Sequence, residues 1–368
     1  IYHRESYSKY DIDSIIYFMQ LYEPSKVALI QPPEVGTYRL EELLIANPGL
    51  GAGIAKENIQ RTYTYNDYFS YWETFDTIVY VEDDYELALL ASTYASLLNA
   101  PLVIKDANLD LHEIFVGRNV ICVGSVSPAG SSCSEQYTLE TLRQKYKSKT
   151  GTNKAILINP TDWDTGVVRG SFPTDKALTI GKLYTKTSLM APILASAKHE
   201  LLISTTKTDK DKIDNYIQPS LSGISYLTIM ASEKSIPQRA FMETRGTMKL
   251  YWALDQSLYA DTNGDHKPEI AAGRIAGISS SDISSYIARV LFFDRFRKTN
   301  RVMFMASSFG GTMEFWVKNL MSAFKDLENS GYYIEEDMTA EESYDFDPKN
   351  WEDKELIFYV DHGWAYWQ

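Results

Sequence analysis

Residues 77–105 read TIVYVEDDYELALLASTYASLLNAPLVIK, and this stretch decides the fold class. It opens with an apolar, β-branched run at 77–81, which predicts a strand buried on both faces. A helical pattern over 84–99 follows and ends just before Pro101, because the residue before a proline is pushed out of the α region. A second apolar run at 101–105 predicts another strand. A strand–helix–strand unit of this kind is typical of a parallel α/β sheet.

The same alternation continues along the rest of the chain. Further strands are predicted at 26–31, 119–124, 154–159, 201–205, 225–230, 269–273, 301–306 and 356–360. Further helices are predicted at 137–149, 187–199, 208–217, 280–298 and 312–329. We therefore predict an α/β protein with two doubly wound domains and mainly parallel sheets.

A polar, turn-prone segment at 146–153 predicts a domain boundary near residue 150, so the domains would span 1–149 and 150–368. In the second domain the helices supply the crossovers that parallel strands require. One mainly parallel sheet should then contain the strands at 154–159, 201–205, 225–230, 301–306 and 356–360.

Composition excludes several classes of function. The 368 residues carry 36 Lys and Arg against 49 Asp and Glu, a net charge of −13, which disfavours binding to nucleic-acid phosphates. No window approaches 18 consecutive apolar residues, so no membrane-spanning segment is predicted. The glycines at 49–53 (GLGAG) follow Asn47-Pro48 rather than a strand, and a third glycine is missing. A dinucleotide site needs both features, so we predict no organic cofactor.

The chain has two cysteines, Cys122 and Cys133, 11 residues apart across a turn-rich segment. They could form a short-loop disulfide, worth about 3 kcal/mol in the chain-entropy model. Alternatively they could be two thiols, with Cys122 buried on a strand and Cys133 on a loop. No histidine lies close to them in the sequence, which excludes a zinc cluster.

A dense polar loop, DTNGDHKPE, occupies 261–269. Asp261, Asn263 and Asp265 alternate as the oxygen ligands of calcium loops do. His266 and Ala272 stand where an EF-hand has its glycine and its final glutamate, so the loop is not an EF-hand. The sequence leaves two interpretations, an irregular Ca²⁺ loop or an Asx-rich turn that leads into a strand.

The end of the chain carries a second candidate site. The apolar run at 356–360 leads into Asp361-His362-Gly363. Active sites of α/β sheets lie at the carboxyl ends of their strands, and Gly363 allows the sharp turn that would leave the imidazole of His362 accessible.

From about residue 150 onward, the sequence resembles the gingipain-type cysteine peptidases, relatives of the caspases. ISYLTIMASEKSIP (224–237) resembles that family's strand and its loop ending in Ile-Pro. GDHKPEIAAGRIA (264–276) resembles its acidic loop and E-x-x-x-G-R strand, and the stretch at 279–295 resembles the helix that follows. YVDHG (359–363) resembles its Y-x-G-H-G motif. The resemblance implies a caspase-like fold for the second domain.

The resemblance also implies roles for individual residues. His362 would be the acid–base group, Glu269 its orienting carboxylate, and the backbone N–H of Gly363 a donor to the oxyanion. If Glu269 does not reach the imidazole, Asp265 or Asp361 would take its place. The family's cysteine follows its histidine, whereas Cys122 and Cys133 both precede His362. We therefore expect the nucleophile to lie beyond residue 368 in a longer protein, and the 368-residue chain to be inactive.

Residues 88–104 resemble the helix–Ala-Pro–strand unit of bacterial and archaeal cell-wall-binding repeats, which fits display outside the cell. Two hypotheses follow. The first is an extracellular or cell-surface cysteine peptidase that acts on protein or peptide substrates. The second is a non-catalytic cell-envelope protein, such as a surface-layer component, built on the same fold. A cysteine encoded shortly after residue 368 would favour the first.

Overall fold

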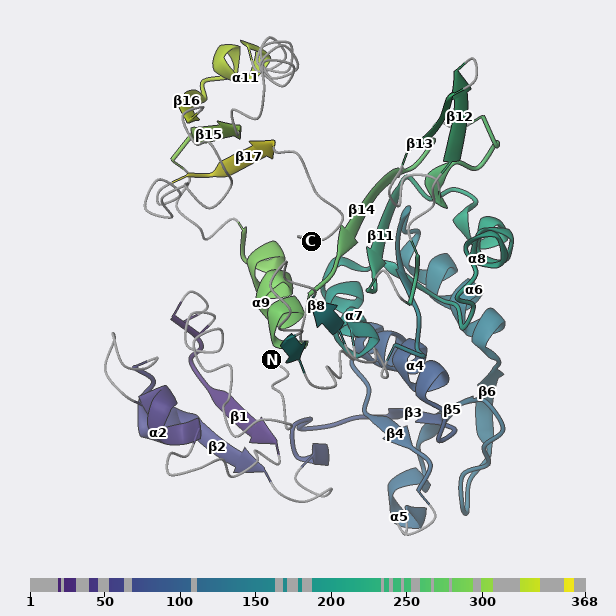
Figure 1. The fold of residues 1–368 in the computed structure, drawn as a ribbon. Helices are drawn as coiled ribbons and strands as arrows, with labels where there is room; N and C mark the ends of the chain where they lie inside the picture. Colours follow the sequence, from purple (N-terminus) through teal and green to yellow (C-terminus); the bar gives the residue numbers. More distant parts are fainter. Residues whose placement is uncertain are drawn as a thin grey trace. The chain divides into compact units, whose positions relative to one another are not determined.

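The fold was analysed in a computed structural model. It describes residues 19–20, 23–30, 40–45, 53–62, 68–106, 111–162, 168–170, 178–180, 187–232, 235–237, 241–245, 248–252, 259–265, 268–277, 280–293, 299–306, 325–337 and 354–360. Contacts divide the chain into two compact units (Figure 1). The first consists of Ile1–Val168 and Ile180–Phe293, and the second of Arg169–Thr179 and Asp294–Gln368.

The first unit contains the sheet that residues 77–105 predict. Its central strand β3 (Thr77–Val81) pairs in parallel with β4 (Leu102–Ile104) on one side and with β5 (Asn119–Val123) on the other. Strand β6 (Cys133–Tyr137) adds to β5, again in parallel, so the strand order is β4-β3-β5-β6. The predicted strand–helix–strand unit is therefore confirmed, and β6 was not predicted.

Side chains of this sheet alternate between two apolar clusters. Val79 and Val81 of β3 pack into a cluster with helices α4 (Tyr85–Leu97) and α6 (Leu139–Thr150). Ile78 and Tyr80 point to the opposite face, where α5 (His112–Phe115) contributes Phe115. Helices on both faces are what a doubly wound sheet requires, because each face of a buried strand must find apolar partners.

A second parallel sheet belongs to the same unit. Strand β7 (Lys154–Ile158) pairs with β10 (Leu201–Ser204) and β11 (Tyr226–Met230), and β14 (Ala271–Ile275) adds to β11. The strand order is β10-β7-β11-β14. The connecting helices are α7 (Thr187–Lys198) and α8 (Lys210–Ile217), and α9 (Ser280–Leu291) follows β14.

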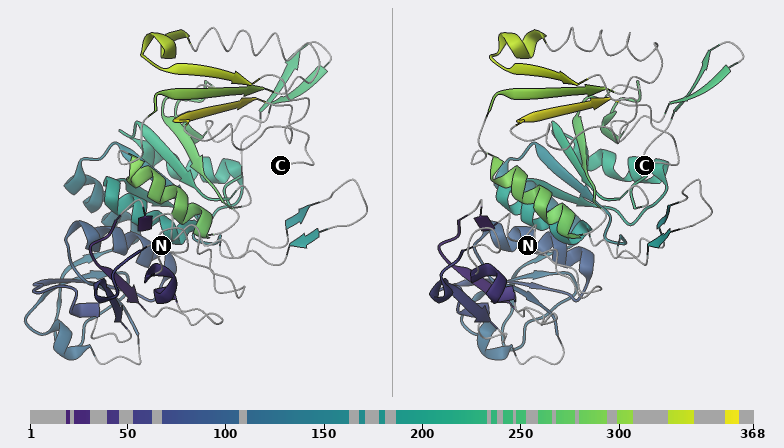
Figure 2. Two further views of the ribbon diagram at one scale, coloured as in Figure 1. Left: turned by 90° about the vertical axis from the view of Figure 1, so that its left-hand side faces the viewer. Right: turned by 60° about the vertical axis from the view of Figure 1, so that its left-hand side comes forward.

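One apolar core joins the two sheets. Helix α4 contacts β3 and β4 of the first sheet and β10 of the second, and it packs along α7, which contacts β7, β10 and β11 (Figures 1 and 2). A single buried cluster accordingly contains side chains from both sheets. The domain boundary predicted near residue 150 falls inside this unit, at the turn between α6 and β7, where Gly151 adopts a φ of 62° and ends α6.

The second unit contains a third parallel sheet. Strand β15 (Arg301–Ala306) lies between β16 (Tyr333–Asp337) and β17 (Leu356–Val360), and helix α11 (Lys325–Asn329) precedes β16. The strands predicted at 301–306 and 356–360 are thus confirmed. The prediction that they share one sheet with 154–159 is wrong, because β14 occupies the edge beside β11 and β16 supplies a different neighbour for β15.

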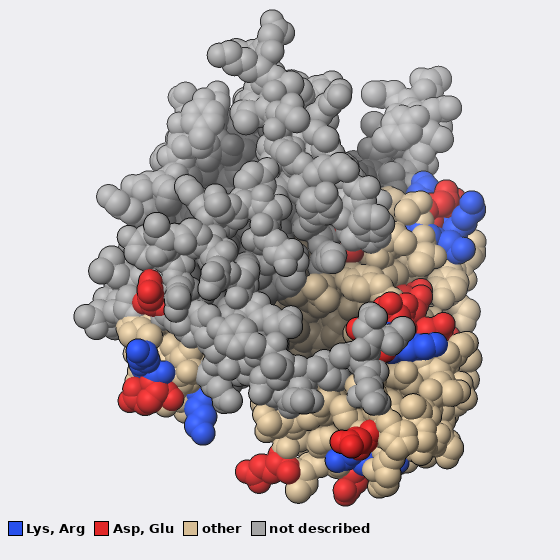
Figure 3. Space-filling view, turned by 90° about the horizontal axis from the view of Figure 1, so that it is seen from below, with Lys and Arg blue, Asp and Glu red and all other residues tan. Residues whose placement is uncertain are grey.

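The remaining elements are short. They include the following: η1 (Lys56–Asn58), η2 (Gln218–Leu221), α2 (Leu40–Ile45), β1 (Val27–Ile30) with β2 (Ile59–Thr62), β8 (Val168–Gly170) with β9 (Leu178–Ile180), and β12 (Phe241–Arg245) with β13 (Met248–Trp252). None of the described helices is long and apolar enough to cross a bilayer. On the described part of the face in Figure 3, acidic and basic side chains lie in small mixed groups.

Glu200 is a half-buried acidic group whose titration is testable. It lies at the turn between α7 and β10, and its buried Oε2 lacks a hydrogen-bond partner. Burial raises the pKa of its carboxyl group, while Lys154 and Lys198 partly oppose the shift. The folded state therefore holds the proton to a higher pH than the unfolded state. The free energy of unfolding should fall as pH rises from the ordinary glutamate pKa of about 4.3 through the raised value.

The variant Glu200→Gln should be more stable than the wild type near neutral pH and should lose this pH dependence. Urea denaturation of both proteins across that pH window measures the difference, with the exposed Glu113→Gln as the matched control. If the free energy of unfolding depends on pH in the same way for wild type and Glu200→Gln, the raised pKa of Glu200 is contradicted.

Candidate functional site

The loop that follows Ala260 carries the candidate metal ligands. Tyr259 and Ala260 are fully buried, and the Tyr259 hydroxyl donates to the carbonyl of Pro237. The Ala260 carbonyl accepts the N–H groups of Glu269 (3.0 Å) and Ile270 (3.3 Å). These two bonds close the loop at its base, just before β14 begins at Ala271. The chain therefore leaves the core at residue 261 and returns to it at residue 269.

Hydrogen bonds within the loop fix its turn. Oδ1 of the buried Asp261 accepts the N–H of Gly264 at 2.7 Å, and Gly264 has a φ of 80°. Oδ1 of Asn263 accepts the N–H of Asp265 at 2.8 Å. Side chains that accept a backbone N–H two or three residues further on are the signature of Asx turns.

Glu269 folds back over this turn. Its Oε2 accepts from the Thr262 N–H (2.7 Å) and the Thr262 hydroxyl (3.1 Å), and its Oε1 accepts from Nδ2 of Asn263 at 2.7 Å. The sequence predicted Asp261, Asn263 and Asp265 as ligands and gave Glu269 a catalytic role. The structure instead groups the carboxylates of Asp261, Asp265 and Glu269, whose ligand atoms lie within 4.8 Å of one another. Asn263 uses both amide atoms in hydrogen bonds inside the loop.

Three carboxylates at this spacing repel one another. Two unit charges 4 Å apart interact by about 4 kcal/mol at an effective dielectric constant of 20. A hard divalent cation would relieve that repulsion and accept the oxygens as ligands. Counted from Asp261 as position 1, the loop has oxygen-bearing side chains at positions 3, 5 and 9, and position 9 is Glu269. These positions also bear ligands in the EF-hand loop, where position 9 often acts through water. From this spacing, the sequence could have identified Glu269 as a further candidate metal ligand.

The predicted catalytic residues His362 and Gly363 lie outside the described residues, as does Asp361. The strand that leads to them is described. β17 runs parallel to β15, with Val302 opposite Leu356 and Ala306 opposite Val360. Residues 361–363 therefore follow the last residue of a confirmed strand, but that strand belongs to the sheet of the second unit and not, as predicted, to the sheet of β7.

The structure decides between the two interpretations of the cysteines. Cys122 and Cys133 form a disulfide, and no free cysteine remains among the 368 residues. Cys133 is the first residue of β6, not part of a loop, and the bridge joins it to the adjacent strand β5.

Sequence analysis missed a buried polar network at the carboxyl end of β7. Asn159 is fully buried, and its Nδ2 donates to the carbonyls of Ser235 (2.7 Å) and Lys207 (3.1 Å). Asp162 is also buried, and its carboxylate accepts the N–H (2.8 Å) and hydroxyl (2.9 Å) of Ser188 near the start of α7. An asparagine and an aspartate directly after an apolar strand were the available signal. These groups hold together the loops that follow β7, β10 and β11.

No family model matches this chain, and no similar curated protein or solved structure was found. The function must therefore be argued from the sites themselves.

Proposed function

We propose that the chain belongs to an extracellular or cell-surface cysteine peptidase-like protein in which His362 is the acid–base group. The observation that carries the proposal is the placement of β17, because its parallel pairing with β15 leads the chain directly into residues 361–363. A histidine at that edge can take the proton of a thiol and return it to the leaving amine of a peptide. The N–H of Gly363 would then donate to the oxyanion.

The thiolate in this proposal comes from outside the 368 residues. Both cysteine sulfur atoms of the chain are joined in the disulfide, and a bridged cysteine is not a thiolate nucleophile. A disulfide also fits an oxidising compartment, which supports a location outside the cytosol. Glu269 belongs to the first unit and His362 to the second, and the three loop hydrogen bonds of Glu269 account for its carboxylate, so the proposal rests on His362 alone.

The test uses the protein with whatever residues its gene encodes after codon 368. That protein should hydrolyse peptides in a thiol-dependent reaction, and His362→Ala should lower kcat/KM by about 10²–10⁴-fold, the usual contribution of a general acid–base. The matched control is His199→Asn, which changes an exposed histidine at the end of α7 where φ is 54°. The 368-residue chain alone should not react with peptidyl thiol-directed inhibitors.

An alternative function is a non-catalytic cell-envelope protein on the same fold. Two observations favour it: both cysteines are bridged, and the loop hydrogen bonds of Glu269 suffice to explain that residue. The same experiment discriminates between the two functions. If the gene encodes no further cysteine, or if His362→Ala leaves hydrolysis unchanged, the peptidase proposal is wrong.

We further propose that Asp261, Asp265 and Glu269 bind Ca²⁺ as a structural cofactor, with Oδ1 of Asn263 as a further donor through the lone pair that the bond from the Asp265 N–H leaves unused. Binding to the folded state alone stabilises it by about 2.7 kcal/mol when free Ca²⁺ is 100 times the dissociation constant. The melting temperature should therefore rise with Ca²⁺ and fall again with a chelator.

The variant Asp261→Asn should lose most of that Ca²⁺-dependent shift, and Asp83→Asn, an exposed aspartate elsewhere in the first unit, should keep it. Differential scanning calorimetry with and without chelator measures both. If the wild type melts identically with and without chelator, the Ca²⁺ proposal is wrong and the loop is an Asx turn that binds no metal.

A further inference from the structure

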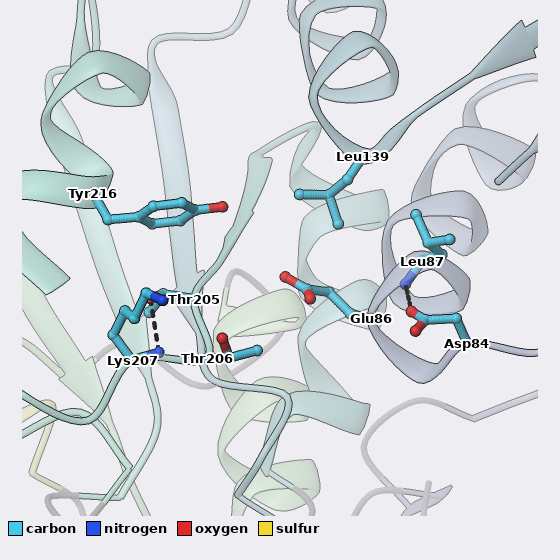
Figure 4. A pocket seen from close by; sticks show the side chains of 8 residues that line it. All are labelled: Asp84, Glu86, Leu87, Leu139, Thr205, Thr206, Lys207 and Tyr216. Atoms are coloured by element: carbon cyan, nitrogen blue, oxygen red, sulfur yellow. Dashed lines mark hydrogen bonds between the residues drawn. The ribbon is translucent and has the colours of Figure 1, made fainter. Parts of the chain in front are cut away.

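A pocket of about 410 Å³ lies in the first unit, and the proposed function does not use it. Its walls come from segments that follow the carboxyl ends of three parallel strands. The N-cap and first turn of α4, which follows β3, contribute Asp84, Glu86 and Leu87. The start of α6 contributes Leu139, and the loop after β10 contributes Thr205, Thr206 and Lys207, with Tyr216 of α8 opposite (Figure 4). Ligands of open α/β sheets bind at the carboxyl ends of strands, and the volume lies within the roughly 300–1,000 Å³ of small-molecule sites.

Charges of both signs line this pocket without neutralising each other. Asp84 uses Oδ1 to cap α4, accepting the Leu87 N–H at 2.8 Å. In the part of the chain that the structure describes, the carboxylate of Glu86 and the ammonium group of Lys207 make neither a hydrogen bond nor an ion pair. Lys207 is fixed through its backbone, since its N–H donates to Oγ1 of Thr205 at 3.2 Å and its carbonyl accepts from Asn159 at 3.1 Å. An acidic and a basic group, each unpaired, match a ligand that carries both charges.

A buried cation lies behind one wall of the pocket. Arg143 follows Leu139 by one turn of α6, and only 5% of its side chain is exposed. Its guanidinium group is within 3.5 Å of Oγ of Ser204 and 3.4 Å of Oγ of Ser220, which lie next to Thr205 and one turn after Tyr216. Arg143 therefore ties together the three segments that carry Leu139, Thr205 and Tyr216. Such bracing holds the lining in place before a ligand arrives, which lowers the entropy lost on binding.

The rest of the lining combines the hydroxyl groups of Thr205 and Thr206 with apolar surface. Figure 4 shows the Tyr216 ring extended across the pocket toward Leu139 and Glu86, with the Thr206 side chain below. Leu87 and Leu139 provide aliphatic surface, and Tyr216 keeps 42% of its surface exposed. An apolar ligand group placed here would cover surface that is otherwise in contact with water.

We propose that this pocket binds a small α-amino acid with an apolar side chain. Its carboxylate is held by Lys207, its ammonium group by Glu86, and its side chain lies against Tyr216, Leu87 and Leu139. Charge-assisted hydrogen bonds at both ends give the specificity, because a ligand that lacks one charge leaves a protein charge without a partner. The site contains none of residues 361–363 and is independent of the peptidase proposal.

The experiment titrates the 368-residue chain by isothermal calorimetry with four probes: leucine, N-acetylleucine, leucine amide and glucose. Leucine should bind, and the two blocked forms, each lacking one charge, should bind about tenfold more weakly or worse, which corresponds to the loss of one charge-assisted hydrogen bond. Glucose tests the alternative that the hydroxyl groups and the Tyr216 ring select a neutral polyol.

Two variants assign the charges to their partners. Glu86→Gln should weaken leucine about tenfold and remove its advantage over N-acetylleucine, while Lys207→Gln should remove its advantage over leucine amide. A variant that merely disturbs the fold would weaken all three ligands equally. The matched controls are the exposed Glu73→Gln and Lys105→Gln in the same unit, which should bind leucine as the wild type does. The proposal is overturned if leucine does not bind, if the blocked forms bind equally well, or if glucose binds more tightly than leucine.

Discussion

Removing the Cys122–Cys133 disulfide should lower the free energy of unfolding of the first unit by about 3 kcal/mol, the value of the chain-entropy model for a loop of this size. The 11-residue separation closes a short loop between adjacent strands. Strand β6 depends on that closure, because its residues are only exposed or half-buried, unlike the fully buried residues of β3 and β5. Loss of the bridge should therefore loosen β6 before the rest of the sheet.

Two experiments distinguish the stability that the covalent bridge contributes from the stability that packing of its sulfur atoms contributes. Reduction of the wild type keeps both sulfur atoms in place, whereas the double variant Cys122→Ala/Cys133→Ala also removes the buried Sγ of Cys122. Urea denaturation and amide hydrogen exchange should show most of the loss in both arms, with the largest gain in exchange at 133–137. Exchange is the decisive readout, because a chain with two compact units need not unfold in a single step. Equal protection of β6 in the oxidised and reduced protein would contradict this prediction.

Much of the fold could be predicted because the strands are continuous apolar runs. The structure confirms the strands predicted at 77–81, 154–159 and 201–205 to within one residue at each end. Helices α4 and α7 could also be predicted, because each has a long helical pattern that ends where a proline or the next strand follows. By contrast, CSEQY at β6 and YIEED at β16 are polar edge strands with exposed side chains, and they lack the apolar signal.

Sheet membership could not be predicted from the same patterns. A buried parallel strand is apolar on both faces, so its sequence does not show which neighbour it pairs with. The strands at 301–306 and 356–360 fit the sheet of β7 by pattern alone, yet they pair with each other, and β16 pairs with the first of them. The core that the first two sheets share could not be predicted for the same reason. Leu89 and Leu90 of α4 give the same sequence pattern whether one sheet or two lie against the helix.

The candidate metal loop was found from its spacing, but the role of Glu269 was not. The alternation of Asp261, Asn263 and Asp265 is a local pattern and is visible in the sequence. The bonds from Thr262 and Asn263 to Glu269 depend on the loop closing at Ala260, which only the fold supplies. The buried role of Asn159 could not be predicted for the same reason, because the carbonyl groups to which it donates are 48 and 76 residues away in the sequence.

Replacing Asn159 by alanine should destabilise the first unit by about 3 kcal/mol. Its side chain makes four hydrogen bonds: Nδ2 donates to Lys207 and Ser235, and Oδ1 accepts from the Thr161 N–H (3.0 Å) and hydroxyl (2.7 Å). Each buried polar group left without a partner costs about 1–3 kcal/mol. The Ser235 residue is buried and would lose its donor, while the exposed Lys207 can turn to water.

The isosteric variant Asn159→Asp makes the prediction specific to hydrogen bonding. An aspartate fills the same space but places a buried carboxylate against two carbonyl oxygens, so both desolvation and the missing donors disfavour its charged form. Its pKa should be raised in the folded state, and the variant should regain stability as pH falls through that raised value, because the protonated carboxyl can donate one bond again. Urea denaturation of wild type, Asn159→Ala and Asn159→Asp between neutral and mildly acidic pH measures this difference. The matched control Thr161→Val removes one hydroxyl at the exposed end of the network and should change stability by less than about 1.5 kcal/mol. If Asn159→Asp is as stable as the wild type at neutral pH, the network does not hold the loops after β7, β10 and β11 together.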